Sequence, residues 1–218
     1  MKNSLNARIK VISGLYAITP DEADTAAALC KVRLALLGGA RVVQYRNKIA
    51  DGALRLKQAV ALRELTREFA ATLIVNDDVA LARQVEADGA HLGGTDGTVA
   101  EARAALGGGR LIGVSCYNRL ALAQEAVRQG ADYVAFGSFF ASTVKPDAVV
   151  ATLDLLREAR RELTVPIVAI GGITVQNGAQ LLKAGADALA VISAVFSAPD
   201  VEGAAREFSN LFEQGKPA

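Results

Sequence analysis

The feature that most constrains the fold is a strand-and-helix unit that recurs along the whole chain. Short apolar runs rich in Val, Ile, Leu and Ala alternate with longer amphipathic stretches, a pattern typical of parallel strands joined by helices. The clearest helical stretches are 54–70, 98–106, 118–129 and 174–184. Eight apolar runs are expected to be strands: 14–20, 41–47, 72–77, 89–94, 111–116, 133–139, 166–172 and 188–194.

A short glycine motif precedes several of these strands. It reads GGAR at 38–41, DGAH at 88–91, GADYV at 130–134 and GADAL at 185–189, and each glycine is expected to take the left-handed conformation that ends a helix. Eight such units and no Pro- or Ser-rich linker predict one α/β domain over residues 1–218, a single (β/α)8 TIM barrel, with 1–12 as an N-terminal extension or helix. A doubly wound open sheet is the alternative, because strands are easily miscounted.

Composition limits the classes of partner and the cellular location that we expect for the chain. The chain has 24 basic and 23 acidic residues, a net charge of +1, so nothing indicates a nucleic-acid surface. No apolar run reaches the roughly 18 residues of a membrane span, and the N-terminal run lacks a signal-peptide cleavage site. Cys30 and Cys116 lack the close spacing of metal or redox pairs. We therefore expect a cytoplasmic protein with small-molecule ligands, compatible with a homo-oligomer.

The end of the second predicted strand carries two cations. Gln44, Arg46 and Lys48 alternate with Tyr45 and Asn47, so a period of two places the first three on one side of the strand. TIM barrels concentrate their chemistry at the C-terminal ends of the strands. Because unpaired buried charges cost several kcal/mol each, either these cations bind an anionic ligand, or they are exposed or paired with carboxylates.

Acidic residues follow the next two predicted strands. Asn76 and Asp77 end the third strand, and Asp96 follows the fourth. Two carboxylates from neighbouring strand ends suit Mg²⁺, whose remaining coordination positions are then filled by substrate phosphates and water. Either carboxylate taken alone is as readily a helix cap or a surface residue, and Asp78 is expected to be such a cap.

The last two predicted strands end in small residues. GGI at 171–173 and Ser193–Ala194 lie where backbone N–H groups often bind a phosphate in this fold, although tight turns needed only for packing would read the same way. His91 is the single histidine and is expected to be a core imidazole with a backbone partner. Ser115 is then expected to hydrogen-bond rather than act as a nucleophile, and Cys116 to pack.

Taken in order, the strand-end segments resemble the thiamine phosphate synthase family from Tyr16 to about Phe196. The segments are QYRNK (44–48), ND (76–77), HLGGTD (91–96), GVSCYN (113–118), GSFFASTVKPDA (137–148), AIGGI (169–173) and VISA (191–194). The resemblance implies condensation of 4-amino-2-methyl-5-pyrimidinylmethyl diphosphate with 4-methyl-5-(2-phosphoethyl)thiazole, giving thiamine phosphate and diphosphate. It also implies a dissociative mechanism, in which Mg²⁺-assisted loss of diphosphate leaves a pyrimidine methyl cation for the thiazole nitrogen to attack.

The resemblance also implies roles for individual residues. The pyrimidine diphosphate would lie on the segment Gln44, Tyr45, Arg46, Asn47 and Lys48 together with Asn76, Ser115 and Lys145, of which Arg46, Ser115 and Lys145 would be catalytic. Asp77 and Asp96 would hold Mg²⁺. The thiazole phosphate would lie on Gly172, Ile192 and Ser193 and on the loop residues Ser142, Thr143 and Val144.

Two positions depart from the family pattern. Gly94 and Thr95 stand where the family has a glutamine-containing turn, and Val144 stands where it has a threonine. A lost hydrogen bond to a charged group is worth about 1.5 to 3 kcal/mol, so Val144 is expected to weaken binding of the thiazole phosphate by roughly ten- to a hundredfold unless Thr143 or a backbone N–H replaces the lost contact.

These departures leave other functions open. A related thiazole tautomerase would share the barrel, although the family pattern there has a histidine after the fifth strand's serine, where this chain has Cys116. A non-catalytic sensor of thiamine phosphates is a second alternative. A phosphosugar isomerase or aldolase is a third, with Lys145 as the candidate base or Schiff-base lysine.

Overall fold

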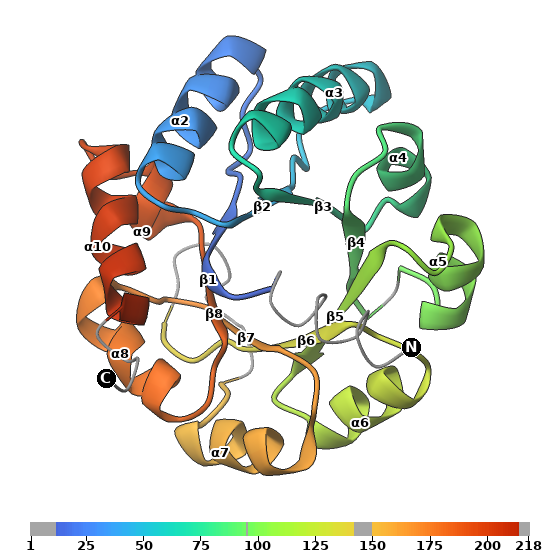
Figure 1. The fold of residues 1–218 in the computed structure, drawn as a ribbon, viewed down its shortest axis with the longest axis vertical. Coiled ribbons are helices and arrows are strands. Elements are labelled where there is room, and N and C mark those ends of the chain that lie inside the picture. The colour runs from blue at the N-terminus through green and yellow to red at the C-terminus, as the bar shows by residue number, and fades with distance from the viewer. Residues whose placement is uncertain (1–11, 95, 142–149, 214–218) are drawn as a thin grey trace.

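The computed structural model describes residues 12–94, 96–141 and 150–213, and these form a closed barrel of eight parallel strands. Strand order follows the chain, and the first strand pairs with the eighth through the register Tyr16–Ala190. The helices form an outer ring around the strands (Figure 1). The predicted (β/α)8 barrel is therefore confirmed, and the open-sheet alternative is wrong.

The strands and helices alternate along the chain. The strands are β1 (Gly14–Ile18), β2 (Val42–Tyr45), β3 (Thr72–Asn76), β4 (Gly89–Leu92), β5 (Leu111–Tyr117), β6 (Tyr133–Phe136), β7 (Ile167–Ile170) and β8 (Ala188–Val191). The helices are α2 (Thr25–Leu37), α3 (Gly52–Glu68), α4 (Val79–Gln84), α5 (Val99–Leu106), α6 (Leu120–Arg128), α7 (Leu153–Glu162), α8 (Val175–Lys183), α9 (Ser193–Phe196) and α10 (Val201–Glu213).

Most strands end two or three residues earlier than the apolar runs suggest. β2 ends at Tyr45 and β7 at Ile170, whereas the sequence predicted strand through 47 and 172. The predicted strand residues 46–47 and 171–172 lie past the observed strand ends, in loops of the barrel mouth. The side chains predicted to carry function therefore lie mostly on these loops, which is usual for a scaffold that presents a site on loops above a rigid sheet.

Apolar side chains fill two layers. The larger layer packs between the strands and the helices, and the smaller one fills the barrel interior with residues that include Tyr16, Ile74, Tyr133 and Val168. Ile12, the described end of the predicted N-terminal extension, is fully buried in this interior layer. Burial on both faces explains why the strands read as continuous apolar runs.

A repeated ion pair closes the N-terminal face of the barrel. An aspartate just before β4, β6 and β8 accepts a 2.8 Å hydrogen bond from a backbone N–H near the start of the preceding strand. Each aspartate also pairs with an arginine from the helix before that strand. The sets are Asp88 with Leu73 and Arg63, Asp132 with Ile112 and Arg103, and Asp187 with Ile167 and Arg160. The strand-and-helix unit that recurs in the sequence therefore repeats the same aspartate contacts in the structure.

The glycines of the repeat behave as predicted at three of the four places. Gly39, Gly130 and Gly185 have φ values of +98°, +95° and +113° and follow helices. Gly89 does not, and here the prediction was wrong: Glu86 takes the positive φ after α4, and Gly89 is the first residue of β4. A Cβ at Gly89 would lie 2.2 Å from the Leu111 carbonyl oxygen, so close strand packing requires the glycine.

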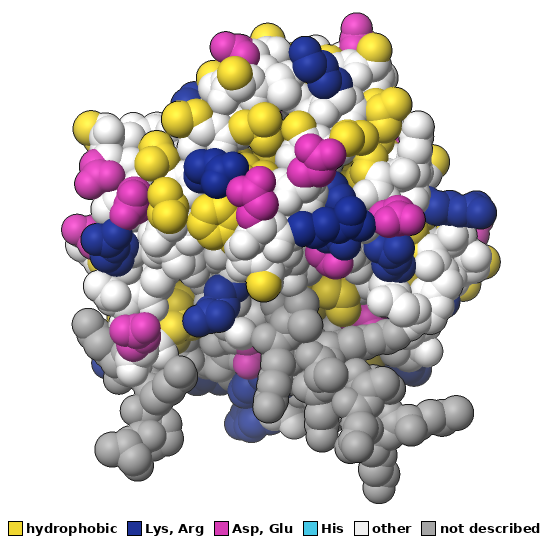
Figure 2. All heavy atoms as spheres, turned by 45° about the horizontal axis from the view of Figure 1, so that its top comes forward, with side chains coloured by type: hydrophobic (Ala, Val, Ile, Leu, Met, Phe, Trp, Pro, Cys, Tyr) yellow, Lys and Arg dark blue, Asp and Glu magenta, His cyan; other side chains and the backbone are white. Residues whose placement is uncertain are grey.

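Charged residues of both signs lie on the face of the molecule that Figure 2 shows. Figure 2 shows acidic and basic side chains interspersed over the face turned toward the viewer, with apolar side chains between them. Within the described ranges, no helix combines the length and the apolar character that a membrane span requires.

Candidate active site

A pocket of about 710 Å³ opens at the C-terminal mouth of the barrel. Its walls come from the ends of strands β1 to β8 and the loops that follow them. Seven residues predicted from the sequence line it: Gln44, Arg46, Asn76, Ser115, Gly172, Ile192 and Ser193. The structure therefore brings together residues from the ends of β2, β3, β5, β7 and β8 that lie up to 149 positions apart in the sequence.

Arg46 is held at the rim of this pocket by the end of β1. Its guanidinium lies 3.2 Å from an Asp21 carboxylate oxygen, which also accepts a 2.7 Å hydrogen bond from the Lys48 backbone N–H. Its own backbone N–H donates to the Thr19 hydroxyl at 2.8 Å, and that hydroxyl donates to the Arg46 carbonyl oxygen. The side chain is only 18% exposed. These contacts fix the position of one cation at the mouth.

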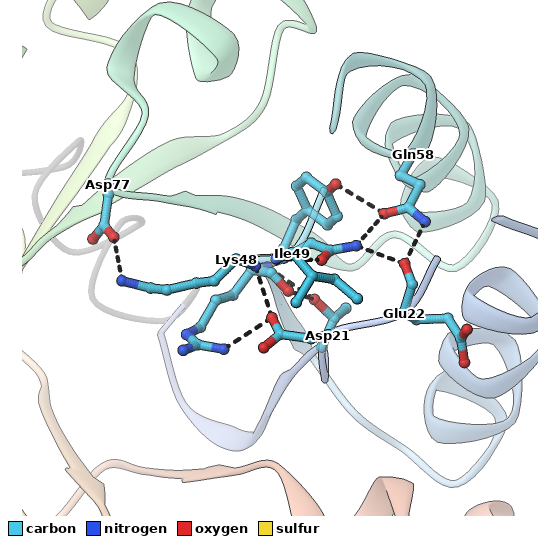
Figure 3. Close-up of polar contacts among 10 residues, drawn as sticks. Asp21, Glu22, Lys48, Ile49, Gln58 and Asp77 are labelled. Carbon is cyan, nitrogen blue, oxygen red and sulfur yellow. Dashed lines mark hydrogen bonds and ion pairs between the residues drawn. The ribbon is translucent and has the colours of Figure 1, made fainter. Parts of the chain in front are cut away.

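Lys48 reaches toward the end of β3. Its Nζ lies 3.4 Å from Asp77 Oδ2, and Figure 3 shows the side chain extended toward that carboxylate. Lys48, Asp77, Arg46 and Asn76 line a second hollow of about 280 Å³ beside the main pocket. Both cations thus have carboxylate partners, as expected if they serve only the structure. Both also border a pocket, as expected if they bind an anionic ligand.

Asp77 and Asp96 meet at the rim. Asp77 has a φ of +61°, a conformation that aspartate tolerates better than most residues, and its backbone N–H donates to the His91 carbonyl oxygen at 2.8 Å. An Asp96 carboxylate oxygen accepts from the Gly93 N–H at 2.8 Å. Burial raises the pKa of Asp77, and the neighbouring Asp96 carboxyl raises it further, whereas Lys48 lowers it.

This carboxylate pair fits a cation that also binds substrate. Among the described residues no group of three or more His, Cys, Asp or Glu side chains could hold a metal ion, so this part of the chain offers two carboxylates and no closed cage. Mg²⁺ is commonly bound in this way, with substrate phosphate oxygens and waters as its other ligands. Asp78, the next residue, accepts from the Leu81 N–H at 2.9 Å and caps α4 as predicted.

Tyr45 and Asn47 do not line the main pocket but border the smaller hollow beside it. The Tyr45 hydroxyl and the Asn47 side-chain amide both donate to Gln58 Oε1 of α3, each at 2.9 Å, and Asn47 also donates to the Glu22 carbonyl oxygen. Figure 3 shows Gln58 on the side of Lys48 away from Asp77. The period of two therefore separates Gln44 and Arg46, which line the main pocket, from two side chains that anchor the segment to a helix.

The loop after β7 has a backbone that only glycine readily adopts. Gly171 and Gly172 have φ values of +103° and +61°. A Cβ on Gly172 would lie 2.3 Å from the Ala141 carbonyl oxygen. The Gly172 carbonyl oxygen accepts a 3.0 Å hydrogen bond from Asn177 of α8. The turn is thus tightly packed and also lines the pocket. It therefore fits both interpretations of the sequence, a turn required for packing and a loop that binds a phosphate.

The turn after β8 presents a helix start to the same pocket. Ile192 is the N-cap residue of α9 and Ser193 its first residue, and no side chain of a described residue caps this end. Backbone N–H groups at the first turn of a helix have no partner inside the helix. Together with Gly172 they form a wall of main chain at the mouth.

The surroundings of His91 correct one prediction, that of a backbone partner, and give Ser115 the predicted hydrogen-bonding role. Its ring nitrogens contact side chains rather than a backbone partner: Nε2 lies 2.9 Å from Ser115 Oγ, and Nδ1 lies 3.1 Å from the Tyr133 hydroxyl. Ser115 therefore does have a histidine partner, supplied by β4, which adjoins β5. Burial lowers the pKa of His91 to about 4, while the charge of Asp96 opposes this. Cys116 is buried, as predicted, and burial raises its pKa to about 12.

Several predicted residues lie outside the described ranges. They are Thr95 and the loop residues Ser142, Thr143, Val144 and Lys145. Their roles therefore rest on the sequence alone. Ala141, the described residue just before that loop, lines the main pocket.

Sequence reasoning missed two polar residues at the end of β1. Thr19 and Asp21 contact Arg46 and Lys48, although neither was predicted to take part in the site. The signal was present, because Thr19 lies at the end of the predicted strand 14–20 and Asp21 follows it directly, the criterion that identified the other strand ends. His91 was missed for a different reason: its partners Ser115 and Tyr133 are 24 and 42 residues away.

Fold and pocket together define a TIM-barrel enzyme whose site lies at the C-terminal mouth. The family model described as "Thiamine monophosphate synthase" matches residues 15–195. The chain belongs to this family. The match covers all eight strands apart from Gly14, the first residue of β1, and every strand-end residue discussed above.

Relatives agree with this assignment. The chain is 55% identical over 201 residues to the thiamine-phosphate synthase of Methylobacillus flagellatus, covering 92% of this chain and 96% of that one. It is 54% identical over 210 residues to the thiamine-phosphate synthase of Acidithiobacillus ferrooxidans, covering 94% and 97%. The solved thiamine phosphate pyrophosphorylase of Pyrococcus furiosus is 39% identical, with a TM-score of 0.85 and coverage of 96% and 98%.

Proposed function

We propose that this chain is a thiamine phosphate synthase: it condenses 4-amino-2-methyl-5-pyrimidinylmethyl diphosphate with 4-methyl-5-(2-phosphoethyl)thiazole and releases diphosphate. The observation that carries the proposal is the rim of the pocket. Arg46, Lys48 and the Asp77–Asp96 pair stand together there, a combination suited to a diphosphate and its metal ion. Membership of the family supports the same substrates.

The pyrimidine diphosphate would occupy the side of the pocket formed by β2, β3 and β5. Arg46, Lys48 and Asn76 would bind its phosphate oxygens, while Gln44 and Ser115 lie deeper, where the ring would sit. Asp77 and Asp96 would hold Mg²⁺, which when bound neutralises part of the negative charge of the diphosphate. Lys145 would contact the same leaving group.

The thiazole phosphate would occupy the opposite side. Gly172, Ile192 and Ser193 offer main-chain N–H groups at two loop ends, the places where this fold commonly binds a phosphate. Ser142, Thr143 and Val144 would complete this second phosphate site. The two substrates would then face each other across one pocket.

Catalysis would consist of stabilising the departing diphosphate. The C–O bond to the pyrimidine methylene breaks, diphosphate takes the electron pair, and the thiazole nitrogen then attacks the resulting cation. No proton has to be removed for the new C–N bond to form, so no general base is required. Arg46 is preorganised by Asp21 and Thr19, and one preorganised contact to developing charge is worth about 3 to 4 kcal/mol.

The proposal is tested by mixing the purified chain with both phosphorylated precursors and Mg²⁺ and measuring thiamine phosphate. Product is expected only when both precursors are present, and chelation of Mg²⁺ should abolish or strongly reduce it. Tight binding of thiamine phosphate without any turnover would instead indicate a sensor. Isomerisation of the thiazole substrate alone would indicate a tautomerase. A cytoplasmic location and a homo-oligomeric state stay predictions from the sequence.

A further inference from the structure

An unbroken row of hydrogen bonds crosses the barrel interior beneath the pocket. Gln44 Nε2 donates to the Tyr16 hydroxyl at 2.8 Å, and that hydroxyl lies 2.9 Å from the Tyr133 hydroxyl. The Tyr133 hydroxyl lies 3.1 Å from His91 Nδ1, and His91 Nε2 lies 2.9 Å from Ser115 Oγ. The row links β2, β1, β6, β4 and β5, and both ends line the main pocket.

The inner members of the row are almost entirely buried, although Tyr16 and His91 also border the main pocket. Tyr16 is 1% exposed, Tyr133 0% and His91 8%. Burial also raises the pKa of both tyrosines, so each hydroxyl keeps its proton. Buried polar groups are almost always hydrogen-bonded, because an unsatisfied one costs about 1 to 3 kcal/mol. Each inner hydroxyl must therefore both accept and donate within the row.

The end at Gln44 then sets the direction of every bond. The Gln44 amide nitrogen can only donate, so the Tyr16 oxygen accepts from it and the Tyr16 proton goes to Tyr133. The Tyr133 proton goes to His91 Nδ1, which must be unprotonated. A neutral imidazole with a bare Nδ1 carries its proton on Nε2, and Nε2 donates to Ser115 Oγ. The Ser115 proton is left for a group in the pocket.

We propose that His91 is a positioning residue that holds the Ser115 hydroxyl as a hydrogen-bond donor into the pocket, through a row of bonds that begins at Gln44. The same arrangement leaves the Gln44 carbonyl oxygen as an acceptor at the other end. The two ends together present a donor and an acceptor to one ring. Such a pair selects a heterocycle that offers both a lone pair and an N–H group, which a neutral aminopyrimidine does.

The chain's single histidine allows a direct test. Untagged protein labelled with ¹⁵N-histidine gives one pair of ring nitrogens in an NMR spectrum, and the shifts of these nitrogens report which one is protonated. At pH 7 we expect a neutral ring with the proton on Nε2 and a bare Nδ1. A proton on Nδ1 would mean that the row runs the other way and would overturn the inference.

Tyr133→Phe supplies the matched spectroscopic variant. It removes one hydroxyl from a buried ring and changes the volume little, so the barrel should still fold. Loss of the donor to Nδ1 should change the Nδ1 shift and yield a mixture of the two tautomers. An unchanged tautomer and unchanged shifts in folded Tyr133→Phe would show that Tyr133 does not set the histidine and would overturn the inference.

Two substitutions of His91 separate positioning from packing. In His91→Gln the longer amide can place an N–H near the position of Nε2, whereas in His91→Asn the shorter amide ends near Nδ1 and cannot reach Ser115. We expect His91→Asn to raise the Michaelis constant for the pyrimidine diphosphate at least tenfold, and His91→Gln to keep it within about threefold of wild type. Equal Michaelis constants in both folded variants would overturn the role.

The kinetic measurement rests on the proposed function, whereas the NMR measurement does not. Because the ring nitrogens are observed without turnover, they support or overturn the row of bonds even in a chain that forms no thiamine phosphate. The proposed function fails if no product forms with wild-type protein. The two failures are therefore distinguishable.

Discussion

Lys48 Nζ lies 3.4 Å from Asp77 Oδ2, so a cation from the loop after β2 and a carboxylate from the end of β3 share one rim of the barrel mouth. Asp96 approaches the same carboxylate from the next loop, and burial and this second acid together raise the pKa of Asp77. A cation bound between the acids would relieve their repulsion and would bring the diphosphate within reach of Lys48 and Arg46.

Asp77→Asn tests this relationship. The change removes one of two carboxylates proposed to hold Mg²⁺, so we expect kcat to fall about a hundredfold or more. Steady-state rates over a range of Mg²⁺ concentrations measure the effect. The matched control is Asp78→Asn, because Asp78 caps α4 and asparagine caps a helix about equally well. Similar rates in the two variants would contradict the metal role of Asp77.

Lys145→Ala tests the loop that the resemblance places against the leaving group. Loss of one positive charge from the departing diphosphate should lower turnover about a hundredfold or more. The rate is measured at saturating concentrations of both substrates. Lys183→Ala is the control, since Lys183 is exposed in the last turn of α8 and should leave the rate unchanged. A near-wild-type rate in folded Lys145→Ala would remove this lysine from the mechanism.

Gly172→Ala tests the proposed thiazole phosphate site. A methyl group would lie 2.3 Å from the Ala141 carbonyl oxygen, and the φ of +61° is strained for alanine, so the loop must move. We expect the Michaelis constant for thiazole phosphate to rise at least tenfold, with a smaller change for the pyrimidine diphosphate. Gly108→Ala is the control, because a Cβ there meets open space. Unchanged constants for thiazole phosphate in a folded Gly172→Ala protein would count against the site.

The buried histidine predicts an acid-dependent loss of stability. The pKa of His91 is about 4 in the folded chain, against 6.5 for an unperturbed histidine. Below 6.5 the unfolded chain therefore binds a proton that the folded chain does not, so the free energy of unfolding falls as the pH drops toward 4, by about 3 kcal/mol in total.

Denaturant titrations between pH 7 and 4 measure this loss. His91→Gln should flatten the pH dependence relative to wild type, since glutamine does not titrate. The contributions of the carboxylates are common to both proteins and cancel in the difference. If the free energy of unfolding of the wild type changes with pH in parallel with that of His91→Gln, His91 has the same pKa in the folded and unfolded states.

The sequence predicted the architecture well because a barrel repeats one local unit. Strand type, helix type and the shared pocket-facing side of Gln44 and Arg46 all follow from residue periodicity, and the position of the mouth follows from strand direction. Strand ends were predicted too late, because apolar runs continue into packed loops such as 171–173. The periodicity of apolar residues does not predict which residue is the last to pair with the neighbouring strand.

The missed contacts depend on distances that no local pattern encodes. His91 and Ser115 belong to neighbouring strands, and only the register His91–Gly113 in β4 and β5 brings them side by side. Tyr16 and Tyr133 meet across the barrel from β1 and β6. Asp21 reaches Arg46 through the path of the loop after β1. Such contacts follow from closure of the barrel and not from the spacing of residues.

The central claim is that one pocket joins a pyrimidine diphosphate to a thiazole phosphate. Phosphorus NMR of a mixture of the chain, Mg²⁺ and both substrates tests it most directly, because substrates and products have different signals. Free diphosphate and thiamine phosphate should appear in equal amounts while both substrate signals decline. Substrate signals that persist unchanged with folded wild-type protein would contradict it.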